Sequence, residues 1–118
     1  MEDGKSQFDL VVVGGGPGGY GAALYAAAAG LEVALVEMEK LGGTCLHVGC
    51  IPAKELLETA SVLRTVREAG EFGVKTSSPE LDILQLMRRK QGVIDKLTSG
   101  VEGLLARRKV TVFGGLAN

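Results

Sequence analysis

Two cysteines, the only ones in the chain, are the residues best suited to do chemistry. Cys45 and Cys50 are separated by the four residues Leu46-His47-Val48-Gly49. No secretory signal is recognisable ahead of them, because Asp9 directly precedes the first apolar run. A close cysteine pair in such a sequence indicates redox chemistry rather than a structural disulfide.

A disulfide between these cysteines requires an irregular backbone. Residues five positions apart on a regular helix have Cα atoms about 8–9 Å apart, whereas a disulfide spans about 5.5–6 Å. Gly49 permits the irregular turn that would bring Cys45 and Cys50 together. The closed loop is so short that we expect a strained bond, and strained, accessible disulfides are the labile, catalytic kind.

Two other interpretations of the cysteines stay open. Free cysteines often serve as small buried apolar side chains. Cys45, His47 and Cys50 also offer three metal ligands, but the chain holds no other Cys or His. A closed zinc site would therefore need a carboxylate or another chain as its fourth ligand, and we predict no metal.

The first element that positions the cysteines is a strand followed by a glycine-rich segment. Phe8–Val13 is rich in β-branched residues, as is typical of a buried parallel strand. After the glycine-rich residues 14–19, the pattern predicts a helix over Tyr20–Ala29 and a second strand over Leu31–Glu37.

This context is the dinucleotide-binding pattern, in which three glycines lie between a strand and a helix and an acid ends the next strand. Gly14 would make the tight turn, Gly16 would let the backbone approach a pyrophosphate, and Gly19 would permit close helix packing. Glu37 would accept hydrogen bonds from the ribose hydroxyls and repel a 2′-phosphate, which disfavours NADP. A purely structural glycine turn is the alternative. The residues of this loop predicted to bind the cofactor are Gly14, Gly16, Pro17, Gly18 and Gly19.

The second half of the chain predicts two long helices and one more strand. A helix carrying the cysteines is expected from Thr44 to about Glu68, interrupted at Pro52, with a loop over Ala69–Ser78. An amphipathic helix is expected over about Leu81–Arg107, followed by a strand over Val110–Phe113. The fold class is therefore α/β: a Rossmann-like, three-stranded parallel βαβ unit with long helices.

Composition excludes several partners. Lys and Arg number 13 against 14 Asp and Glu, with no basic stripe, so nucleic-acid binding is not expected. The uncharged stretch from Asp9 to Glu32 is interrupted by glycines and Pro17, which argues against a transmembrane span. We expect a cytoplasmic protein without membrane contact, with a polar, frayed segment over residues 1–7.

With these features in this order, the chain resembles the N-terminal part of the FAD-dependent pyridine nucleotide–disulfide oxidoreductases. The segments Gly42–Leu46 and Gly49–Pro52, followed by Lys54, show the closest resemblance to the dihydrolipoamide dehydrogenase branch. Glutathione and mercuric reductases share the same block. The resemblance covers nearly all 118 residues.

The resemblance implies a role for each matching residue. The first dinucleotide site would hold FAD, with NAD as a co-substrate of a longer parent protein. Cys45 would attack a substrate disulfide, and Cys50 would lie against the flavin and form a charge-transfer pair with it. Lys54 would favour the reduced, anionic flavin by Coulomb attraction. Further cofactor contacts would come from Gly43, Thr44, Cys45 and Ala117.

The resemblance also implies a parent reaction. Dihydrolipoamide would reduce the disulfide, electrons would pass to FAD, and hydride would leave to NAD. The parent would be a homodimer, acting on a lipoamide-type disulfide within a 2-oxo acid dehydrogenase complex. Residues 1–118 would be the N-terminal portion of its FAD-binding domain, without the NAD and dimerisation domains and without the catalytic His–Glu pair. We therefore expect the isolated segment to be marginally stable, to retain FAD weakly and to lack dehydrogenase turnover.

Three alternative functions stay open: another flavin disulfide reductase, a non-catalytic nucleotide-binding module, and a thiol redox carrier without flavin. Two residues also depart from the family pattern. His47 stands where Asn is usual, and Ala53 stands where Ser or Thr is common. A surface imidazole is the favoured interpretation of His47, and a neighbour that lowers a thiol pKa is the other.

Overall fold

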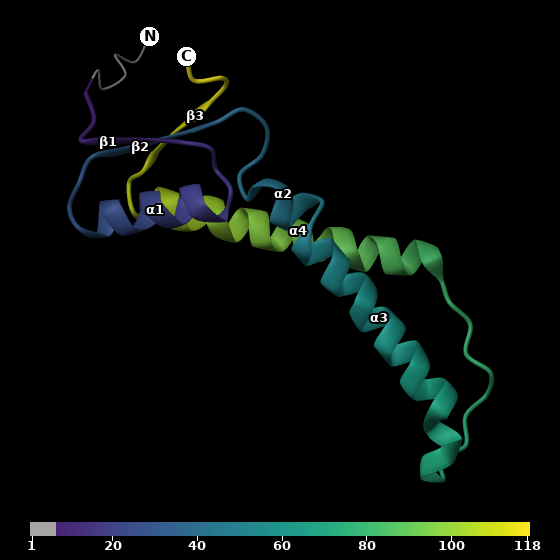
Figure 1. Ribbon diagram of the computed structural model, residues 1–118. Helices are drawn as coiled ribbons and strands as arrows, with labels where there is room; N and C mark the ends of the chain where they lie inside the picture. Colours follow the sequence, from purple (N-terminus) through teal and green to yellow (C-terminus); the bar gives the residue numbers. More distant parts are fainter. Residues whose placement is uncertain (1–6) are drawn as a thin grey trace.

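A three-stranded parallel sheet organises the chain, as Figure 1 shows in a computed structural model that describes residues 7–118. The frayed segment expected over residues 1–7 lies outside the described part of the chain, except for Gln7. The sheet order is β1-β2-β3, and every pairing is parallel, which confirms the predicted α/β class. The elements in chain order are β1 (Leu10–Val13), α1 (Pro17–Ala28), β2 (Val33–Glu37), α2 (Gly43–His47), α3 (Cys50–Glu68), the 3₁₀ helix η1 (Ala69–Phe72), α4 (Ile83–Arg107) and β3 (Thr111–Gly114).

The central strand β2 holds the most buried part of the sheet. Leu35 pairs with Val12 on β1 and with Val112 on β3. Side chains alternate between the two faces of a sheet, so these three point to the same face. Parallel strands need crossover helices, and α1 and α4 are the helices that lead into β2 and β3.

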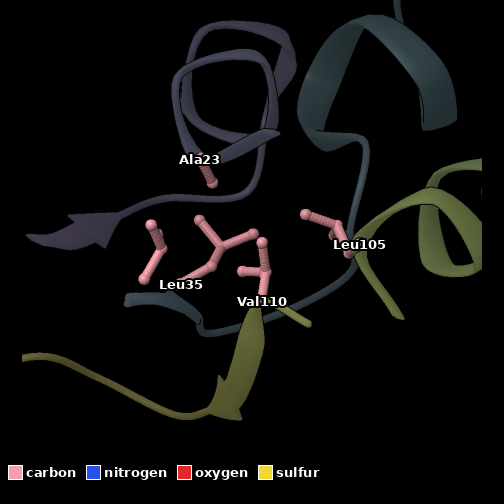
Figure 2. Close-up of a cluster of buried hydrophobic side chains, with 5 residues drawn as sticks. Ala23, Leu35, Leu105 and Val110 are labelled. Atoms are coloured by element: carbon pink, nitrogen blue, oxygen red, sulfur yellow. The ribbon is translucent and has the colours of Figure 1, made fainter. Parts of the chain in front are cut away.

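The hydrophobic core lies between one face of this sheet and helices α1 and α4. Ala23 of α1 and Leu105 of α4 point toward Leu35 and Val110 (Figure 2). Leu35 and Ala23 are fully inaccessible to solvent. Burial of such aliphatic side chains contributes about 1.5–3 kcal/mol each, so this cluster holds both crossover helices on the sheet.

The opposite face of the sheet is open within residues 7–118. Val11 and Val13 of β1 are 54% and 68% exposed, because they point away from α1 and α4. Phe113 on the same face makes an edge-to-face contact with Phe8, with ring centroids 5.9 Å apart. The described residues therefore form two layers, a sheet and one helical layer.

Helices α3 and α4 project beyond the sheet and diverge from one another (Figure 1). Near their closest approach Arg89 of α4 makes a salt bridge to Glu55 of α3 at 3.0 Å. Farther out, apolar side chains such as Leu57, Phe72 and Leu84 are exposed. In α4 the fully buried side chains of the expected amphipathic pattern are Ile94, near the middle of the helix, and Leu105, near its end.

Most predicted elements are present with small shifts at their ends, but the expected interruption at Pro52 was wrong. The helix breaks earlier, at Val48 and Gly49, and Pro52 lies buried in the first turn of α3. A first-turn residue has no intrahelical partner for its N–H, so proline is tolerated there. The loop expected over residues 69–78 also contains the short helix η1.

Two glycines of α1 provide a matched test of how closely this helix packs against the backbone of Gly14. A Cβ on Gly19 would collide with the carbonyl oxygen of Gly14, whereas a Cβ on Gly21 would meet no atom within 4 Å. We expect Gly19→Ala to lower the free energy of unfolding by about 2–3 kcal/mol, as in overpacked sites. Gly21→Ala should raise it by about 0.8–1 kcal/mol through helix propensity. Urea denaturation of both variants measures the difference, and equal effects would contradict the close approach of α1 to the loop.

Candidate redox and dinucleotide site

The helix that carries the cysteines is divided into two pieces, and the division brings the two thiols together. Cys45 lies within α2, and Cys50 is the first residue of α3. Between them the backbone leaves helical geometry at Val48 and Gly49. The irregular turn predicted from the spacing is confirmed, and both cysteines are free thiols.

The turn requires a glycine at position 49, because there is no space for a side chain next to α2. A Cβ on Gly49 would lie 2.9 Å from the carbonyl oxygen of Thr44 and 3.1 Å from Cα of Cys45. Any side chain would therefore push α2 away from the start of α3. The glycine is what allows the two cysteine-bearing pieces to approach each other.

The two thiols differ in their surroundings. Cys45 is half-buried and Cys50 is exposed. The hydrogen bond with Cys50 raises the pKa of the Cys45 thiol above its ordinary value, and partial burial and the charge of Cys50 add to this effect. The positive charge of Lys54 acts in the opposite direction. In the chain as described, Cys45 therefore stays protonated over a wider pH range than an isolated cysteine.

The glycine-rich loop is fastened to the end of β2. Gly14 N–H donates to the carbonyl oxygen of Val36 at 2.8 Å. Gly15 N–H donates to Oε2 of Glu37 at 2.6 Å, and Glu39 N–H donates to Oε1 of the same carboxylate at 2.8 Å. Glu37, the acid predicted to contact a ribose, thus also holds the glycine-rich loop. Each of its carboxylate oxygens keeps a lone pair that can accept a further hydrogen bond.

These hydrogen bonds change the titration of Glu37. The backbone N–H groups of Glu39, Gly15 and Met38 lower the pKa of the Glu37 carboxyl below its ordinary value of 4.5. Partial burial opposes this shift. The carboxylate is therefore the stable form at neutral pH, as a hydrogen-bond acceptor for a ligand requires.

Two cavities meet at the carboxyl end of β2. The larger, of about 770 Å³, extends from Gly16 and Pro17 past Glu37 to Cys45 and Cys50. The second, of about 510 Å³, lies between the ends of β2 and β3 and helix α4. The residues that line both cavities are Glu37, Glu39, Lys40 and His47.

A third, smaller cavity reaches Cys45 from another direction. Its volume is about 180 Å³, and it lies among α1, α2, α3 and α4. Tyr20, Leu97 and Val101 supply much of its wall, and no charged side chain lines it. Cys45 lines both this cavity and the larger one, so its thiol is accessible from two sides.

Of the twelve predicted site residues, seven line one cavity and five do not. The cavity of about 770 Å³ is lined by Gly16, Pro17, Glu37, Gly43, Thr44 and both cysteines. Gly14, Gly18 and Gly19 belong to the adjoining glycine loop but line none of the three cavities described above. Lys54 and Ala117, which are both exposed, line none of them either. His47 is half-buried and hydrogen-bonded, so the surface imidazole expected from the sequence was wrong.

Sequence reasoning missed the wall that α4 contributes. Five polar residues of this helix line the second cavity: Gln91, Asp95, Thr98, Ser99 and Glu102. Their spacing of three and four marks one face of a helix. The sequence therefore showed a polar face on this helix. It did not show that this face would lie opposite the ends of β2 and β3.

Comparison with known proteins assigns the family. Residues 8–117 match the protein family described as pyridine nucleotide-disulphide oxidoreductase. The chain belongs to that family. It is 53% identical over 110 residues to a dihydrolipoyl dehydrogenase of Bacillus subtilis, covering 93% of this chain and 23% of that protein. It is 48% identical over 110 residues to one of Thermus scotoductus, covering 93% and 24%, and 46% identical over 115 residues to one of Acholeplasma laidlawii, covering 97% and 34%.

The chain thus spans about a quarter to a third of the length of these relatives. Within residues 7–118 no helix is both long and apolar enough to cross a membrane. The same residues hold no group of three or more His, Cys, Asp or Glu side chains arranged to bind a metal ion.

The Glu37 contacts predict a pH-dependent stability. Because the folded state lowers the pKa of Glu37, its contribution is present above the ordinary value of 4.5 and is lost as the pH falls through the folded pKa. We expect Glu37→Gln to lower the free energy of unfolding by about 1–2 kcal/mol at pH 7. The difference from the unmodified chain should shrink as the pH is lowered from about 6 to about 3.

Chemical denaturation across this pH range measures both curves. Glu58→Gln, which removes an exposed carboxylate of α3, controls for the loss of one negative charge. Parallel curves for the unmodified chain and Glu37→Gln would contradict the role assigned to the Glu37 carboxylate.

Proposed function

We propose that this chain is the FAD-binding and redox-disulfide segment of a flavin-dependent disulfide oxidoreductase of the dihydrolipoyl dehydrogenase type. One observation supports this most directly: a single cavity is lined by the glycine loop, by Glu37 and by both cysteines. A dinucleotide held by the loop would therefore extend toward the thiol pair.

The residues present fit an elongated dinucleotide. The N-terminus of α1, which follows Gly16, offers backbone N–H groups for a pyrophosphate. The Glu37 carboxylate retains acceptor capacity at the junction of the two cavities and can bind ribose hydroxyls. Gly43, Thr44 and Ala117 are proposed as further contacts on the basis of the family resemblance.

The chemistry of the thiol pair is disulfide exchange with a small dithiol substrate. A substrate thiolate attacks the Cys45 sulfur of the disulfide, and the bond to Cys50 breaks, with Cys50 leaving as a thiolate. The second thiol of the substrate then attacks the substrate sulfur that is bonded to Cys45. This step releases the substrate as a cyclic disulfide and leaves Cys45 as a thiolate. The apolar cavity beside Cys45 suits an aliphatic dithiol such as dihydrolipoamide.

A bound flavin would supply a two-electron acceptor for the reduced pair. Cys50 is proposed to face it, and Lys54 adds positive charge on the same helix. In the complete protein we propose NAD as the final acceptor, a homodimeric assembly and service in a 2-oxo acid dehydrogenase complex.

The exposure of the thiols gives a first test. We expect iodoacetamide at pH 7 to label Cys50 several-fold faster than Cys45, because Cys50 is exposed and the pKa of Cys45 is raised. Mass spectrometry of the reduced chain after timed quenching gives both rates. Faster labelling of Cys45 would contradict the assigned environments.

The cofactor assignment is tested by adding FAD to the same assay. FAD should slow the labelling of Cys50, which it is proposed to cover, more than that of Cys45, whose thiol can also be reached through the smaller cavity. NADP should not protect either thiol, and Glu37→Gln should need more FAD for the same protection, while Glu58→Gln should not. If FAD never protects Cys50 although the pair still forms a disulfide, the chain is a thiol redox module without flavin and the proposal fails.

A further inference from the structure

The His47 side chain lies within the site but has no part in the chemistry proposed above. Its Nε2 is 2.8 Å from the carbonyl oxygen of Leu41. A carbonyl oxygen only accepts hydrogen bonds, so Nε2 carries the hydrogen and donates it. The ring is half-buried and forms part of the wall shared by the two larger cavities.

This hydrogen bond joins the cysteine helix to the segment that contacts the glycine loop. His47 lies on α2 two positions after Cys45. Leu41 immediately precedes Gly42, whose N–H donates to the carbonyl oxygen of Gly15 at 2.8 Å. The imidazole therefore connects α2 back to the backbone that is fastened to the loop.

Helix α2 needs such a connection because it is short. It spans five residues, Gly43–His47, and no side chain caps its N-terminus. Helices of this length are not stable on their own in water. Leu46, which is 6% exposed, anchors one side of the helix in the core, and His47 anchors another.

We propose that His47 is a positioning residue for the cysteine pair: its hydrogen bond to Leu41 holds α2 so that the Cys45 thiol stays within bonding reach of Cys50. The proposal rests on the redox role proposed for the pair and does not involve the flavin. Loss of the hydrogen bond lets α2 move, which lowers the effective concentration of one thiol near the other. The disulfide then becomes less favourable relative to the dithiol.

The test measures the equilibrium between the thiol pair and glutathione in the 118-residue chain. Oxidised glutathione takes two electrons and two protons from Cys45 and Cys50, giving the intramolecular disulfide and two molecules of reduced glutathione. We expect His47→Leu to lower this equilibrium constant about tenfold. His47→Gln, whose amide nitrogen can reach the position of Nε2, should restore it to within about twofold.

Thr65→Val is the matched control. The Thr65 hydroxyl donates to the carbonyl oxygen of Ser61 at 3.0 Å in α3, so this variant also loses one side-chain-to-backbone hydrogen bond, but far from α2. It should leave the equilibrium constant unchanged. An unchanged constant in folded His47→Leu, or equal losses in His47→Leu and His47→Gln, would overturn the proposal.

A second measurement uses the unmodified chain and does not depend on how the variants fold. Nitrogen-15 NMR of the imidazole should show hydrogen on Nε2 and a slowly exchanging proton there. A neutral ring protonated on Nδ1 would overturn the proposal. If the unmodified chain forms no Cys45–Cys50 disulfide at any glutathione ratio, the redox function itself fails, which is a different result from an unaltered constant in His47→Leu.

Discussion

The attachment of the glycine loop to its neighbours is the constraint on which the rest of the site depends. Gly14 and Gly15 donate their N–H groups to the end of β2, and the carbonyl oxygen of Gly15 accepts from Gly42. The loop therefore links the sheet, the start of α1 and the segment that leads into the cysteine helix. Because Gly19 packs against the Gly14 carbonyl, the first turn of α1 is fixed by the same contacts. The pyrophosphate of the proposed cofactor would contact backbone that is already held in place by these hydrogen bonds.

The cysteine pair depends on a second constraint, which is the divided helix. Regular helical geometry separates residues 45 and 50 too far for a disulfide. The break at Val48 and Gly49 removes that obstacle but leaves α2 as a helix of five residues. Such a helix requires tertiary support, which comes from Leu46 in the core and from the hydrogen bond between His47 and Leu41. The cysteine pair and the glycine loop are thus one connected structure.

Two apolar surfaces are exposed in residues 7–118: one face of the sheet and the outer halves of α3 and α4. Residues 7–118 bury one face of the sheet under α1 and α4, while Val11 and Val13 on the other face are exposed. The outer halves of α3 and α4 diverge and expose Leu57 and Leu84 (Figure 1). Parallel sheets normally have helices or other cover on both faces. The relatives that share this segment are three to four times as long.

The sequence by itself determined the order and type of the elements and most of the site. Glycines 14, 16 and 19 between an apolar strand and a helix, followed by Glu37, predicted the loop because few other patterns place these residues in this context. The Cys45–Cys50 spacing predicted an irregular turn at Gly49, since a regular helix could not bring the thiols together. Only the tertiary structure decided that Pro52 is accommodated in a first turn instead of interrupting the helix, and that His47 bonds to Leu41. It also decided that the polar face of α4 forms a wall of the second cavity. These features depend on contacts between segments distant in sequence, and local residue preferences do not encode which segments meet.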